Sequence, residues 1–586
     1  MMARSEKNIL ILDGDMVSSL AIVRSLALKG WSVHVASPSE HGIASTSRFV
    51  KSKMIHPDPL KAEKDFLLWC EFALSGDRFD LIIPVTERTL VPLMKLRHHP
   101  QANKLAMAAN EALETVLDKN KTTELAMQLG LPLPNNFTLT NQEEGRRFVD
   151  QPAVMESLLS QGPLVLKPGR SIGTGKEGRK KLEVKYAFTL EEARSKIENL
   201  LNFGEVIVQE YFQGLGVGVE VLTSNGEVLY AFQHQRVHEL PLTGGASCLR
   251  KSVKVESALL SATESLMKAL SWTGVAMVEF KWNPQTGRFI LVEINGRFWG
   301  SLPLAVGAGA DFPAMLAELL LEGRADSTSA YRPEVYARNL KNDLQWYEQV
   351  LRGETPRGFK GPWQNRKEML KDALRVFSPR HVLDVEKWYD PVPGLFDVIK
   401  IGSSYLNRIK DILVVLKQLQ HHRFAWTTGK AQKCLRGSKK ILFICYGNIN
   451  RSALAERYFK QIAPDSKVEV ISAGFHYEDH RPADPVMIEE SRKLGINMDN
   501  WSSHKVTEEM FESSDVILVM ENEHWLRIKA EYPKYADKTF LLGFAASDVP
   551  KRGEIRDPYG KSRKFYQTAI CEISCSIAGL INIINL

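Results

Sequence analysis

The sequence predicts an α/β protein with several domains, and three regions carry this prediction. Residues 8–36 show a strand, turn, helix and strand, which is typical of a doubly wound parallel sheet. Residues 274–282 and 288–295 are apolar strands joined by a short turn. Residues 440–462 give an apolar strand, a tight loop and a helical run in immediate succession.

Length and composition indicate the number of domains, the partners and the cellular compartment to expect. A chain of 586 residues, 44% of them apolar, suggests about four domains with several cores. A net charge of +7 is too mild to indicate a nucleic-acid partner. Six scattered cysteines without paired spacing favour a reducing cytoplasm. Residues 9–12 are too short for a secretory signal, no transmembrane segment is expected, and the oligomeric state is not predicted.

The N-terminal strands lack a nucleotide fingerprint. No Gly-x-Gly-x-x-Gly follows the strand at residues 8–12, so dinucleotide binding is not favoured. A further strand at residues 81–85 ends at Thr86 and Glu87. Glu87 is either a ligand contact at the carboxyl end of a sheet or a capping carboxylate.

A lysine and a glycine-rich run follow the next apolar strand. Lys167 ends the strand, and residues 169–178 contain four glycines. Glycine lets backbone N–H groups approach phosphates closely, and a lysine neutralises them. The run is not a Walker loop, because no Gly-Lys-Ser/Thr opens a helix there.

The hairpin of residues 274–295 brings two acidic residues together. A turn centred near residues 285–286 sets Glu279 opposite Glu293, where like charges repel. A cation between them would remove the conflict. Asn295 points to the same face as Glu293, and these hard oxygen ligands suit Mg²⁺. The alternative is an exposed hairpin with chance acidic residues.

Together these motifs resemble the ATP-grasp superfamily over about residues 1–325, closest to biotin carboxylase and carbamoyl phosphate synthase. Asp118-Lys119 followed by residues 130–134, and Gln209-Glu210-Tyr211 after a strand, complete the resemblance. It implies α+β domains in which ATP and Mg²⁺ (or Mn²⁺) activate a carboxylate as an acyl phosphate, which an amine then displaces.

The resemblance also implies residue roles. Lys167 would bind ATP phosphates, Lys119 would also bind ATP, and Glu210 would lie in the hinge that holds adenine and ribose. Arg297 would meet the acyl phosphate or the carboxylate. Glu279, Glu293 and Asn295 would bind the metal.

The sequence gives weaker signals for the residues that contact the substrate than for those that bind ATP and metal. Arg236, His238 and Arg250 surround a loop at residues 243–247 and are candidate contacts. Each is equally well explained as a solvated loop charge. No motif identifies the substrate.

Residues 326–437 predict a helical connector and linker. Helices are expected at residues 331–351 and 365–376, and a turn-rich bridge at 391–402. Residues 406–422 form a basic amphipathic helix, whose apolar stripe favours a core or domain contact over a membrane anchor. Residues 427–440 are the expected linker.

The most specific motif runs from Cys445 to Arg451. The loop between strand and helix can wrap backbone N–H groups around an oxyanion at a helix N-terminus, a position that also favours a thiolate. Arg451 can clamp two phosphate oxygens, and Gly447 and Asn448 tolerate the positive φ that such a loop needs. The alternative is a buried cysteine at a strand end.

A carboxylic acid far downstream completes this chemistry. Asp557 precedes Pro558 in a predicted loop. A phosphothiol mechanism needs a proton donor for the leaving oxygen, and a loop carboxyl group can supply it. Alone, Asp-Pro indicates only a turn.

Residues 438–586 resemble the low-molecular-weight protein tyrosine phosphatases. The motifs that carry the resemblance, in order, are Cys445 to Ser452, Ile471 to Phe475, Pro482 to Pro485, Gly495-Ile496, Ser503-His504, Asp515 to Met520 and Asp557 to Tyr559. The family implies a four-stranded parallel α/β domain with Cys445 as nucleophile, Arg451 as phosphate clamp and Asp557 as general acid.

The same resemblance assigns supporting roles. Asn448 and Ser472 would hold the shape of the loop, and Ser452 would hydrogen-bond the thiolate. Tyr446 and Tyr559 would line an aromatic pocket.

This sequence departs from the family pattern at two positions. Asn450 replaces the second loop cysteine of many members, and Ala453 replaces a proline. No cysteine lies between residues 446 and 570, and Cys571 and Cys575 share a helix face that suits core packing, so arsenate reduction is not favoured.

We therefore expect a bifunctional cytoplasmic enzyme. The expected domains are residues 1–115, 116–325, 326–437 and 438–586. Its substrates would be a small carboxylate and an amine in one half, and a phosphotyrosine protein or another phosphomonoester in the other. Two alternatives stay open: the ATP-grasp half is a nucleotide sensor that regulates the phosphatase, or the phosphatase acts on a small phosphorylated metabolite.

Overall fold

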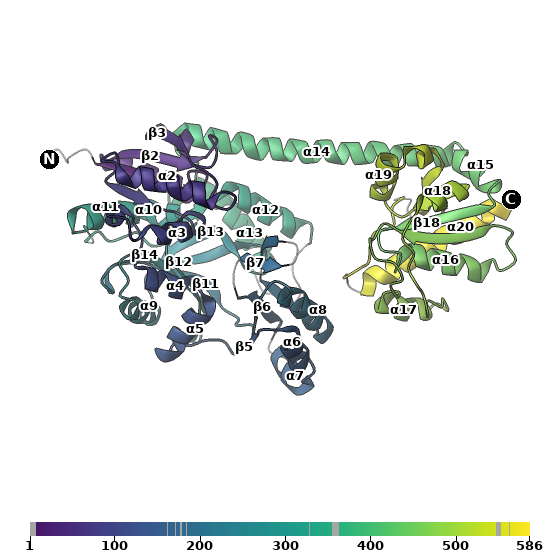
Figure 1. Cartoon of the computed structure of the whole chain (residues 1–586), viewed down its shortest axis with the longest axis horizontal. Helices are drawn as coiled ribbons and strands as arrows, with labels where there is room; N and C mark the ends of the chain where they lie inside the picture. The colour runs from purple at the N-terminus through teal and green to yellow at the C-terminus, as the bar shows by residue number, and fades with distance from the viewer. Residues whose placement is uncertain are drawn as a thin grey trace. The chain divides into compact units, whose positions relative to one another are not determined.

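The computed structural model describes residues 7–160, 162–169, 172–175, 178–182, 184–326, 328–353, 362–546, 553–561 and 563–585 (Figure 1). The chain divides into two compact units, Met1–Ile401 and Gly402–Leu586.

The first sheet of the N-terminal unit is parallel, with strand order β3-β2-β1-β4. Ile9 and Ile11 of β1 pack into the core that contains α1, whereas Leu10 packs into the core that contains α2. Helices therefore cover both faces, which confirms the predicted doubly wound sheet. The bounds are β1 (Asn8–Ile11), α1 (Val17–Leu28), β2 (Ser32–Ser37), β3 (Val50–Ile55), α2 (Glu63–Ser75) and β4 (Leu81–Ile83).

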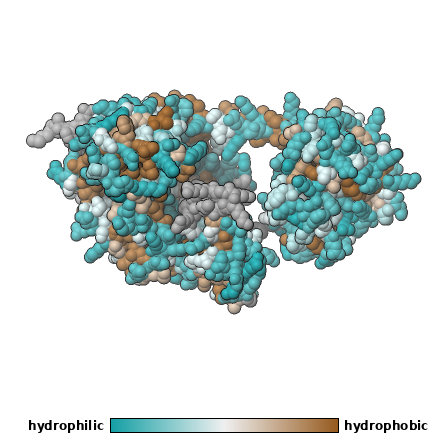
Figure 2. All heavy atoms as spheres, viewed as in Figure 1, coloured by the Kyte–Doolittle hydropathy of each residue, from teal (hydrophilic) through white to brown (hydrophobic). Residues whose placement is uncertain are grey.

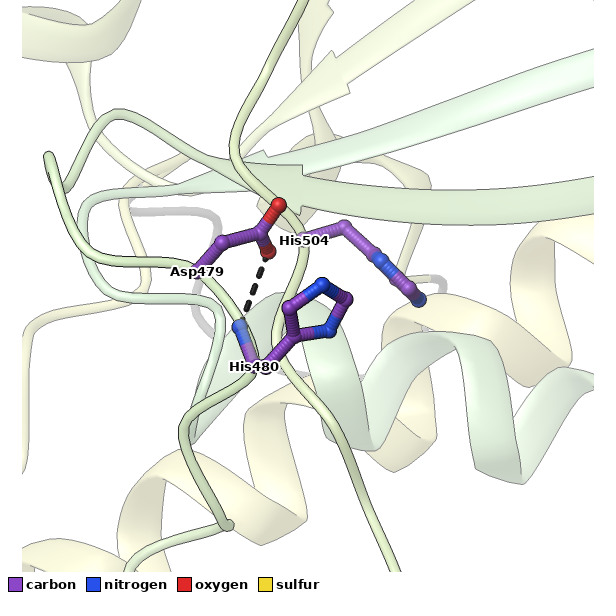
Figure 3. A group of neighbouring side chains, drawn as sticks. All are labelled: Asp479, His480 and His504. Atoms are coloured by element: carbon purple, nitrogen blue, oxygen red, sulfur yellow. Dashed lines mark hydrogen bonds between the residues drawn. The ribbon is translucent and has the colours of Figure 1, made fainter.

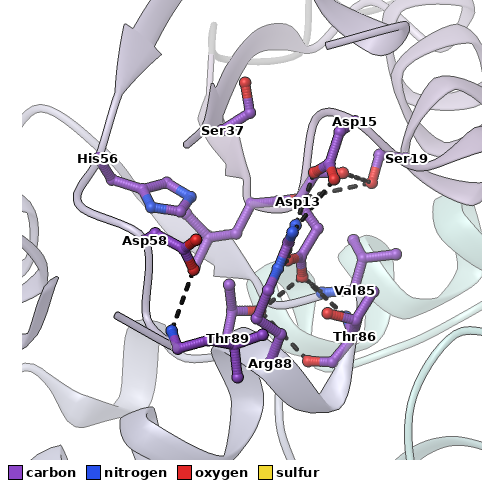
Figure 4. Close-up of polar contacts among 12 residues, drawn as sticks. Asp13, Asp15, Ser19, Ser37, His56, Asp58, Val85, Thr86, Arg88 and Thr89 are labelled. Atoms are coloured by element: carbon purple, nitrogen blue, oxygen red, sulfur yellow. Dashed lines mark hydrogen bonds and ion pairs between the residues drawn. The ribbon is translucent and has the colours of Figure 1, made fainter. Parts of the chain in front are cut away.

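A buried Asp13 just beyond β1 organises the loop after β4 (Figure 4). Its Oδ2 accepts hydrogen bonds from the backbone N–H of Thr86 at 2.8 Å and the hydroxyl of Thr89 at 2.6 Å. Its Oδ1 lies 2.7 Å from Nη2 of Arg88. These bonds fix the start of α3 (Glu87–Leu93), and with it the position of Glu87.

A smaller antiparallel sheet, with order β5-β10-β6-β9, carries Lys167 on β6. Residues 170, 171, 176 and 177 of the predicted glycine-rich loop lie outside the described residues, and the rest of it contributes to the hairpin β7–β8. The bounds are β5 (Asn136–Leu139), α6 (Gln142–Val149), α7 (Pro152–Ser160), β6 (Leu164–Pro168), β7 (Ile172–Gly175), β8 (Gly178–Lys181), β9 (Lys185–Ala187), α8 (Leu190–Leu201) and β10 (Val206–Gln209).

The largest described sheet has the order β15-β14-β11-β12-β13-β16-β17, and only its last pair is parallel. One face packs against α9, and the other joins the core shared with α10 and α11. The bounds are α4 (Asn110–Leu117), α5 (Lys119–Gln128), β11 (Leu215–Ser224), β12 (Glu227–Leu240), β13 (Ala246–Val253), α9 (Ser257–Ala269), β14 (Gly274–Trp282), β15 (Phe289–Asn295), α10 (Leu302–Ala308), α11 (Phe312–Glu322), β16 (Tyr336–Arg338) and β17 (His381–Leu383).

Residues 326–437 contain the expected helices and, in addition, strands β16 and β17. Helix α13 (Arg366–Leu374) matches its prediction closely, whereas α12 (Leu340–Leu351) begins nine residues later than predicted, because β16 occupies part of the predicted span. The predicted turn-rich bridge is wrong, because α14 (Pro391–Thr427) is one continuous helix. Its prolines lie in the first turn, where a missing N–H costs nothing. The expected linker contains α15 (Lys430–Arg436), whose Leu435 is fully buried.

Much of the apolar stripe of α14 is exposed within its own unit, so the predicted core packing is not seen there, and the predicted domain contact stays a prediction. Leu406, Ile409 and Leu413 are each more than half exposed, and apolar patches lie along this helix in Figure 2. Ala425 and Trp426 near the C-terminal end of α14 pack into a core, and Ile401 is also buried. Helical spacing predicts an apolar face but does not say what covers it.

The C-terminal unit contains a parallel sheet with the described strands in the order β19-β18-β20-β21, as expected. Cys445 ends β18, whose neighbours β19 and β20 lie on opposite sides, so the thiol sits at a topological switch point. The bounds are β18 (Lys440–Cys445), α16 (Arg451–Ile462), β19 (Glu469–Gly474), α17 (Pro485–Arg492), α18 (Glu508–Ser513), β20 (Val516–Val519), α19 (Asn522–Glu531), β21 (Thr539–Leu541) and α20 (Arg563–Asn585).

Among the described residues, α20 is long and apolar enough to cross a membrane, and the bent pair α10–α11 passes the same test if it is counted as one span. Ile570, Ile573 and Ile577 of α20 are fully buried in the core of the C-terminal unit. The helix therefore serves as core packing for the sheet in this structure.

Candidate active sites

The first site lies on the hairpin of β14 and β15, where Glu279 pairs directly with Glu293 as predicted. Nδ2 of Asn295 lies 3.3 Å from Oε1 of Glu279 and 3.2 Å from Oε1 of Glu293. Turning the amide over would present its oxygen to a cation held by both carboxylates. This donor set fits Mg²⁺ or Mn²⁺.

Arg236 supplies positive charge beside these carboxylates. Its guanidinium pairs with Glu279 and also lies 3.3 Å from Oε1 of Glu239. Burial raises the pKa of Glu279 despite the opposing charge of Arg236, and neighbouring Glu293 raises it further. Glu279 and Asn295 are buried and Glu293 is partly buried, whereas the turn that joins the two strands is exposed.

The hairpin and the two lysines predicted to bind ATP line one pocket. Lys119, Lys167, Glu293 and Asn295 all line it, and Glu87 lies at its wall. Burial lowers the pKa of Lys167 to about 8, and the charge of Lys119 adds to this effect. Two lysines and the acidic hairpin thus face one cavity, an arrangement suited to a metal-bound polyphosphate.

Glu210 and Arg297 each contact a polar side chain from another segment. Oε2 of Glu210 accepts a hydrogen bond from Nδ2 of Asn135 at 2.8 Å, and the preceding Gln209 lines the pocket. Nη2 of Arg297 lies 3.2 Å from Oε1 of Glu87, which links the first sheet to the hairpin segment.

Arg250 and His238 lie in the protein interior. Arg250 is fully buried, and its Nη2 lies 2.6 Å from Oδ1 of Asp384. Nδ1 of His238 lies 2.7 Å from Oδ1 of Asp343, and its ring stacks on Trp346 with centroids 3.6 Å apart. The contacts described for Arg250 and His238 are with other residues of the protein interior. The role of these two residues as substrate contacts stays a prediction.

The second site surrounds Cys445, which is buried. Its Sγ accepts a hydrogen bond from the backbone N–H of Asn448 at 3.2 Å and lies 3.0 Å from Oγ of Ser452. Asn448 has a φ of 50°, the left-handed conformation predicted for this loop. Gly447 is not among the positive-φ residues, so that expectation applies to Asn448 alone.

Asn448 is the hub of the loop. Its Nδ2 donates to Oγ of Ser452 at 2.9 Å and of Ser472 at 2.8 Å, and its Oδ1 accepts from the backbone N–H of His504 at 2.8 Å. The indole of Trp501 donates to its carbonyl oxygen at 2.7 Å. Every polar group of Asn448 thus holds the loop in one conformation.

Arg451 lies between two carboxylates. Its Nη1 is 2.5 Å from Oε2 of Glu521, and its Nη2 is 2.9 Å from Oδ2 of Asp557. Burial lowers the pKa of Arg451, but the negative charges of Cys445, Asp557 and Glu521 prevail and raise it. The structure thereby brings together the three residues predicted to be catalytic.

The two predicted wall residues are exposed aromatics. Tyr446, directly after Cys445, is 51% exposed, and Tyr559, two residues after Asp557, is 63% exposed. Their rings are therefore free to meet a substrate that enters from solvent.

Sequence reasoning missed two residues of this site. Glu521 is the N-cap residue of α19 and contacts Arg451, which lies 70 positions earlier in the chain. A Cβ on Gly474 would lie 2.7 Å from the carbonyl oxygen of Tyr446 and 2.8 Å from the nitrogen of Asn448. Local periodicity does not predict either contact, although Gly474 lies within the motif from Ile471 to Phe475.

Both units are α/β folds: one has a cavity lined by two lysines and the acidic hairpin, and the other has a buried cysteine at the loop between a strand and a helix. A family model described as low molecular weight phosphotyrosine protein phosphatase matches residues 440–585. A second model, described as ATP-grasp in the biosynthetic pathway with Ter operon, matches residues 202–342.

Curated relatives match the C-terminal unit. The low molecular weight protein-tyrosine-phosphatase Etp of Escherichia coli K12 is 35% identical over 127 residues, which is 22% of this chain and 82% of that protein. The protein-arginine-phosphatase of Bacillus subtilis is 35% identical over 129 residues, 22% of this chain and 84% of that protein.

Among solved structures, an L-amino acid ligase from Bacillus licheniformis is 16% identical, with 56% of this chain and 78% of that chain covered and a TM-score of 0.43. The YwlE mutant from Bacillus subtilis is 31% identical, with 25% and 100% covered and a TM-score of 0.24. By the identity and coverage of its curated relatives, the chain belongs to the low molecular weight phosphotyrosine protein phosphatase family, and residues 202–342 match an ATP-grasp model as well.

Proposed function

We propose that the chain is a bifunctional enzyme that joins an ATP-dependent carboxylate–amine ligase to a cysteine-dependent phosphatase. The observation that carries the phosphatase half is the convergence of Cys445, Arg451 and Asp557 from separate segments, with Nη2 of Arg451 2.9 Å from Oδ2 of Asp557. The pocket shared by Lys167, Glu293 and Asn295 supports the ligase half.

In the phosphatase half, the thiolate of Cys445 attacks phosphorus while Asp557 donates a proton to the departing oxygen. The phosphorus–oxygen bond breaks as the phosphorus–sulfur bond forms. Asp557 then takes a proton from water, which attacks the phosphocysteine and releases inorganic phosphate. Arg451 and the loop N–H groups stabilise charge on the equatorial oxygens.

Ser452 and Asn448 prepare the nucleophile. The Ser452 hydroxyl and the Asn448 backbone N–H can both donate to sulfur, and hydrogen bonds to the charged form favour the thiolate. Glu521 orients the guanidinium of Arg451 so that Nη2 faces the side of Asp557.

In the ligase half, Glu279, Glu293 and Asn295 would hold Mg²⁺ or Mn²⁺, which neutralises phosphate charge when bound. Lys167 and Lys119 bind the phosphates of ATP. Arg236, beside Glu279, and Arg297, beside Glu87, are placed to receive a carboxylate or an acyl phosphate.

The proposed substrates follow from these two chemistries. The ligase half takes a small carboxylate and an amine, and the phosphatase half takes a phosphotyrosine protein. A small phosphometabolite and phosphoarginine, the latter from the name of the Bacillus subtilis relative, are the competing phosphatase substrates. Neither half needs nucleic acid, and the six free cysteines, all in described residues, suit a reducing compartment.

Two assays on the full chain test the proposal. The kcat/KM values of phosphotyrosine peptides, phosphoarginine peptides and sugar phosphates are compared, and we expect the first to be highest. ADP release is measured with a library of carboxylates and amines, and we expect turnover to require both. Nucleotide binding that changes the phosphatase rate without any turnover would instead identify a sensor.

A further inference from the structure

Three side chains outside both sites lie close enough to share a cation. Asp479, His480 and His504 each offer one ligand atom, and these atoms lie within 4.8 Å of one another (Figure 3). Donor atoms around a tetrahedral Zn²⁺ stand about 3.3 Å apart, because Zn–N and Zn–O bonds are about 2.0–2.2 Å long. All three side chains are exposed, so small rotations can close the gap and an ion can enter from solvent.

We propose that Asp479, His480 and His504 form a binding site for a divalent transition metal of the Zn²⁺ class. Two imidazoles and one carboxylate suit this class of ion, whereas Mg²⁺ prefers oxygen ligands alone. Three protein ligands leave the fourth tetrahedral position to water.

The backbone holds these ligands in place before any ion arrives. Oδ1 of Asp479 accepts hydrogen bonds from the backbone N–H groups of His480 and Lys505, both at 3.0 Å. Nδ1 of His480 lies 3.1 Å from Oγ of Ser502, a contact that orients the imidazole. His480 has a φ of 55°, so its ring leaves the chain in a direction that an extended residue would not allow.

Both ligand-bearing segments contact the phosphate loop. The backbone N–H of His504 donates to Oδ1 of Asn448 at 2.8 Å. Nη2 of Arg481, the residue after His480, donates to the carbonyl oxygen of Gly447 at 2.5 Å. An ion held by both segments would therefore cross-link the two supports of the loop that carries Cys445.

The two segments also bond to each other. The N–H of His480 donates to the carbonyl oxygen of Ser503, and the N–H of Ser503 donates to that of Arg481, both at 2.9 Å. The three ligands thus lie on segments that backbone hydrogen bonds already join. Metal binding would therefore order their side chains more than it would move the backbone.

Zn²⁺ titration of the full chain tests the site. The Cys445→Ser chain removes the thiolate as a competing ligand, and saturating Mg²⁺ occupies oxygen sites in the other unit. We expect one Zn²⁺ to compete with a chromophoric chelator, and Co²⁺ in its place to give the absorption of a tetrahedral centre. His480→Asn and His504→Asn should each weaken binding by roughly 10- to 100-fold or more.

The matched control is His421→Asn, an exposed histidine in the same unit that lies outside the cluster. It should leave Zn²⁺ affinity unchanged. Undiminished Zn²⁺ affinity in both cluster variants would overturn the proposal. If either histidine variant fails to fold, Asp479→Asn gives the same test from the third ligand.

Hydrogen exchange tests the cross-link. Zn²⁺ should slow amide exchange in residues 479–481 and 502–505 of the Cys445→Ser chain, and His480→Asn should abolish that protection. Equal exchange with and without Zn²⁺ would contradict the link between the two segments. As a control, the His480→Asn chain with native Cys445 should hydrolyse an aryl phosphate in the absence of metal, which would confirm that the loop around Cys445 is intact.

Discussion

Arg451 and Asp557 lie 106 positions apart in the chain, yet their Nη2 and Oδ2 atoms are 2.9 Å apart. The pair brings the proposed general acid to the proposed phosphate clamp. Because Arg451 is almost fully buried while Asp557 is 42% exposed, the arginine is the fixed partner and the carboxylate can reach the leaving oxygen of a substrate.

Asp557→Asn should slow hydrolysis of phenyl phosphate by about 10²- to 10⁴-fold, because its poor leaving oxygen needs a proton. Hydrolysis of 4-nitrophenyl phosphate should fall far less. The measurement is kcat/KM for both esters, because this ratio reports the step in which the leaving oxygen departs and excludes the later hydrolysis of the phosphocysteine, which Asp557→Asn slows for both. Glu521→Gln is the matched control, since Glu521 touches the same guanidinium but only positions it, and it should slow both esters alike. Equal slowing of both esters by Asp557→Asn would refute the acid role.

Gly474→Ala should reduce phosphatase activity and destabilise the C-terminal unit by about 1–3 kcal/mol. The added Cβ would lie 2.7–2.8 Å from backbone atoms of Tyr446 and Asn448, so the phosphate loop must shift. Gly437→Ala serves as control, because its Cβ would meet nothing within 4 Å. Urea unfolding and kcat measure the two effects, and native values for both would show that the contact does not shape the loop.

Glu293→Gln should weaken the Mg²⁺ dependence of ATP turnover, because it removes one of the two paired carboxylates. The measurement is the Mg²⁺ concentration for half-maximal ADP release, which we expect to rise roughly 10-fold or more. Glu227→Gln, an exposed change on β12, should leave it unaltered. An unchanged Mg²⁺ response in Glu293→Gln would dismiss the hairpin as the metal site.

ATP affinity should fall as pH rises through about 8. The pKa of Lys167 is lowered to about 8 by burial and by Lys119, so its positive charge is present below that pH and is lost above it. At pH 9 only about a tenth of the lysine would be charged. Lys167→Arg should flatten the profile, since arginine stays charged. Nucleotide Kd is measured from pH 7 to 9, and the same slope in Lys167→Arg would assign the titration to another group.

The contacts that were predictable from sequence are local ones. The short turn between β14 and β15 fixes the register, so the pairing of Glu279 with Glu293 follows from counting residues. The strand, loop and helix around Cys445 are contiguous, so their arrangement follows from spacing and from the positive φ that Asn448 tolerates.

The rest depends on contacts between distant segments. Glu521 meets Arg451 only because β20 lies beside β18 in the sheet. Strands β16 and β17 have three residues each, too few to show a period of two. The prolines at the start of α14 predict a turn-rich bridge. The helix is nevertheless continuous, because these prolines fall in its first turn, where they are tolerated.

The domain division of the N-terminal unit stays a prediction. The compact unit runs to Ile401, beyond the boundary expected at residue 325, because β16 pairs with β13 and β17 pairs with β16. Residues 326–401 therefore extend the main sheet as well as supplying helices.

The proposed phosphatase chemistry requires Cys445 to form a covalent bond to phosphorus. The most direct measurement is mass spectrometry of the full chain, acid-quenched during turnover of an aryl phosphate, with Asp557→Asn used to slow hydrolysis of the intermediate. We predict the mass of one phosphoryl group on the peptide that contains Cys445, and its absence in Cys445→Ser. Turnover of the ester by Cys445→Ser at the native rate, or phosphate found on another residue, would contradict this account.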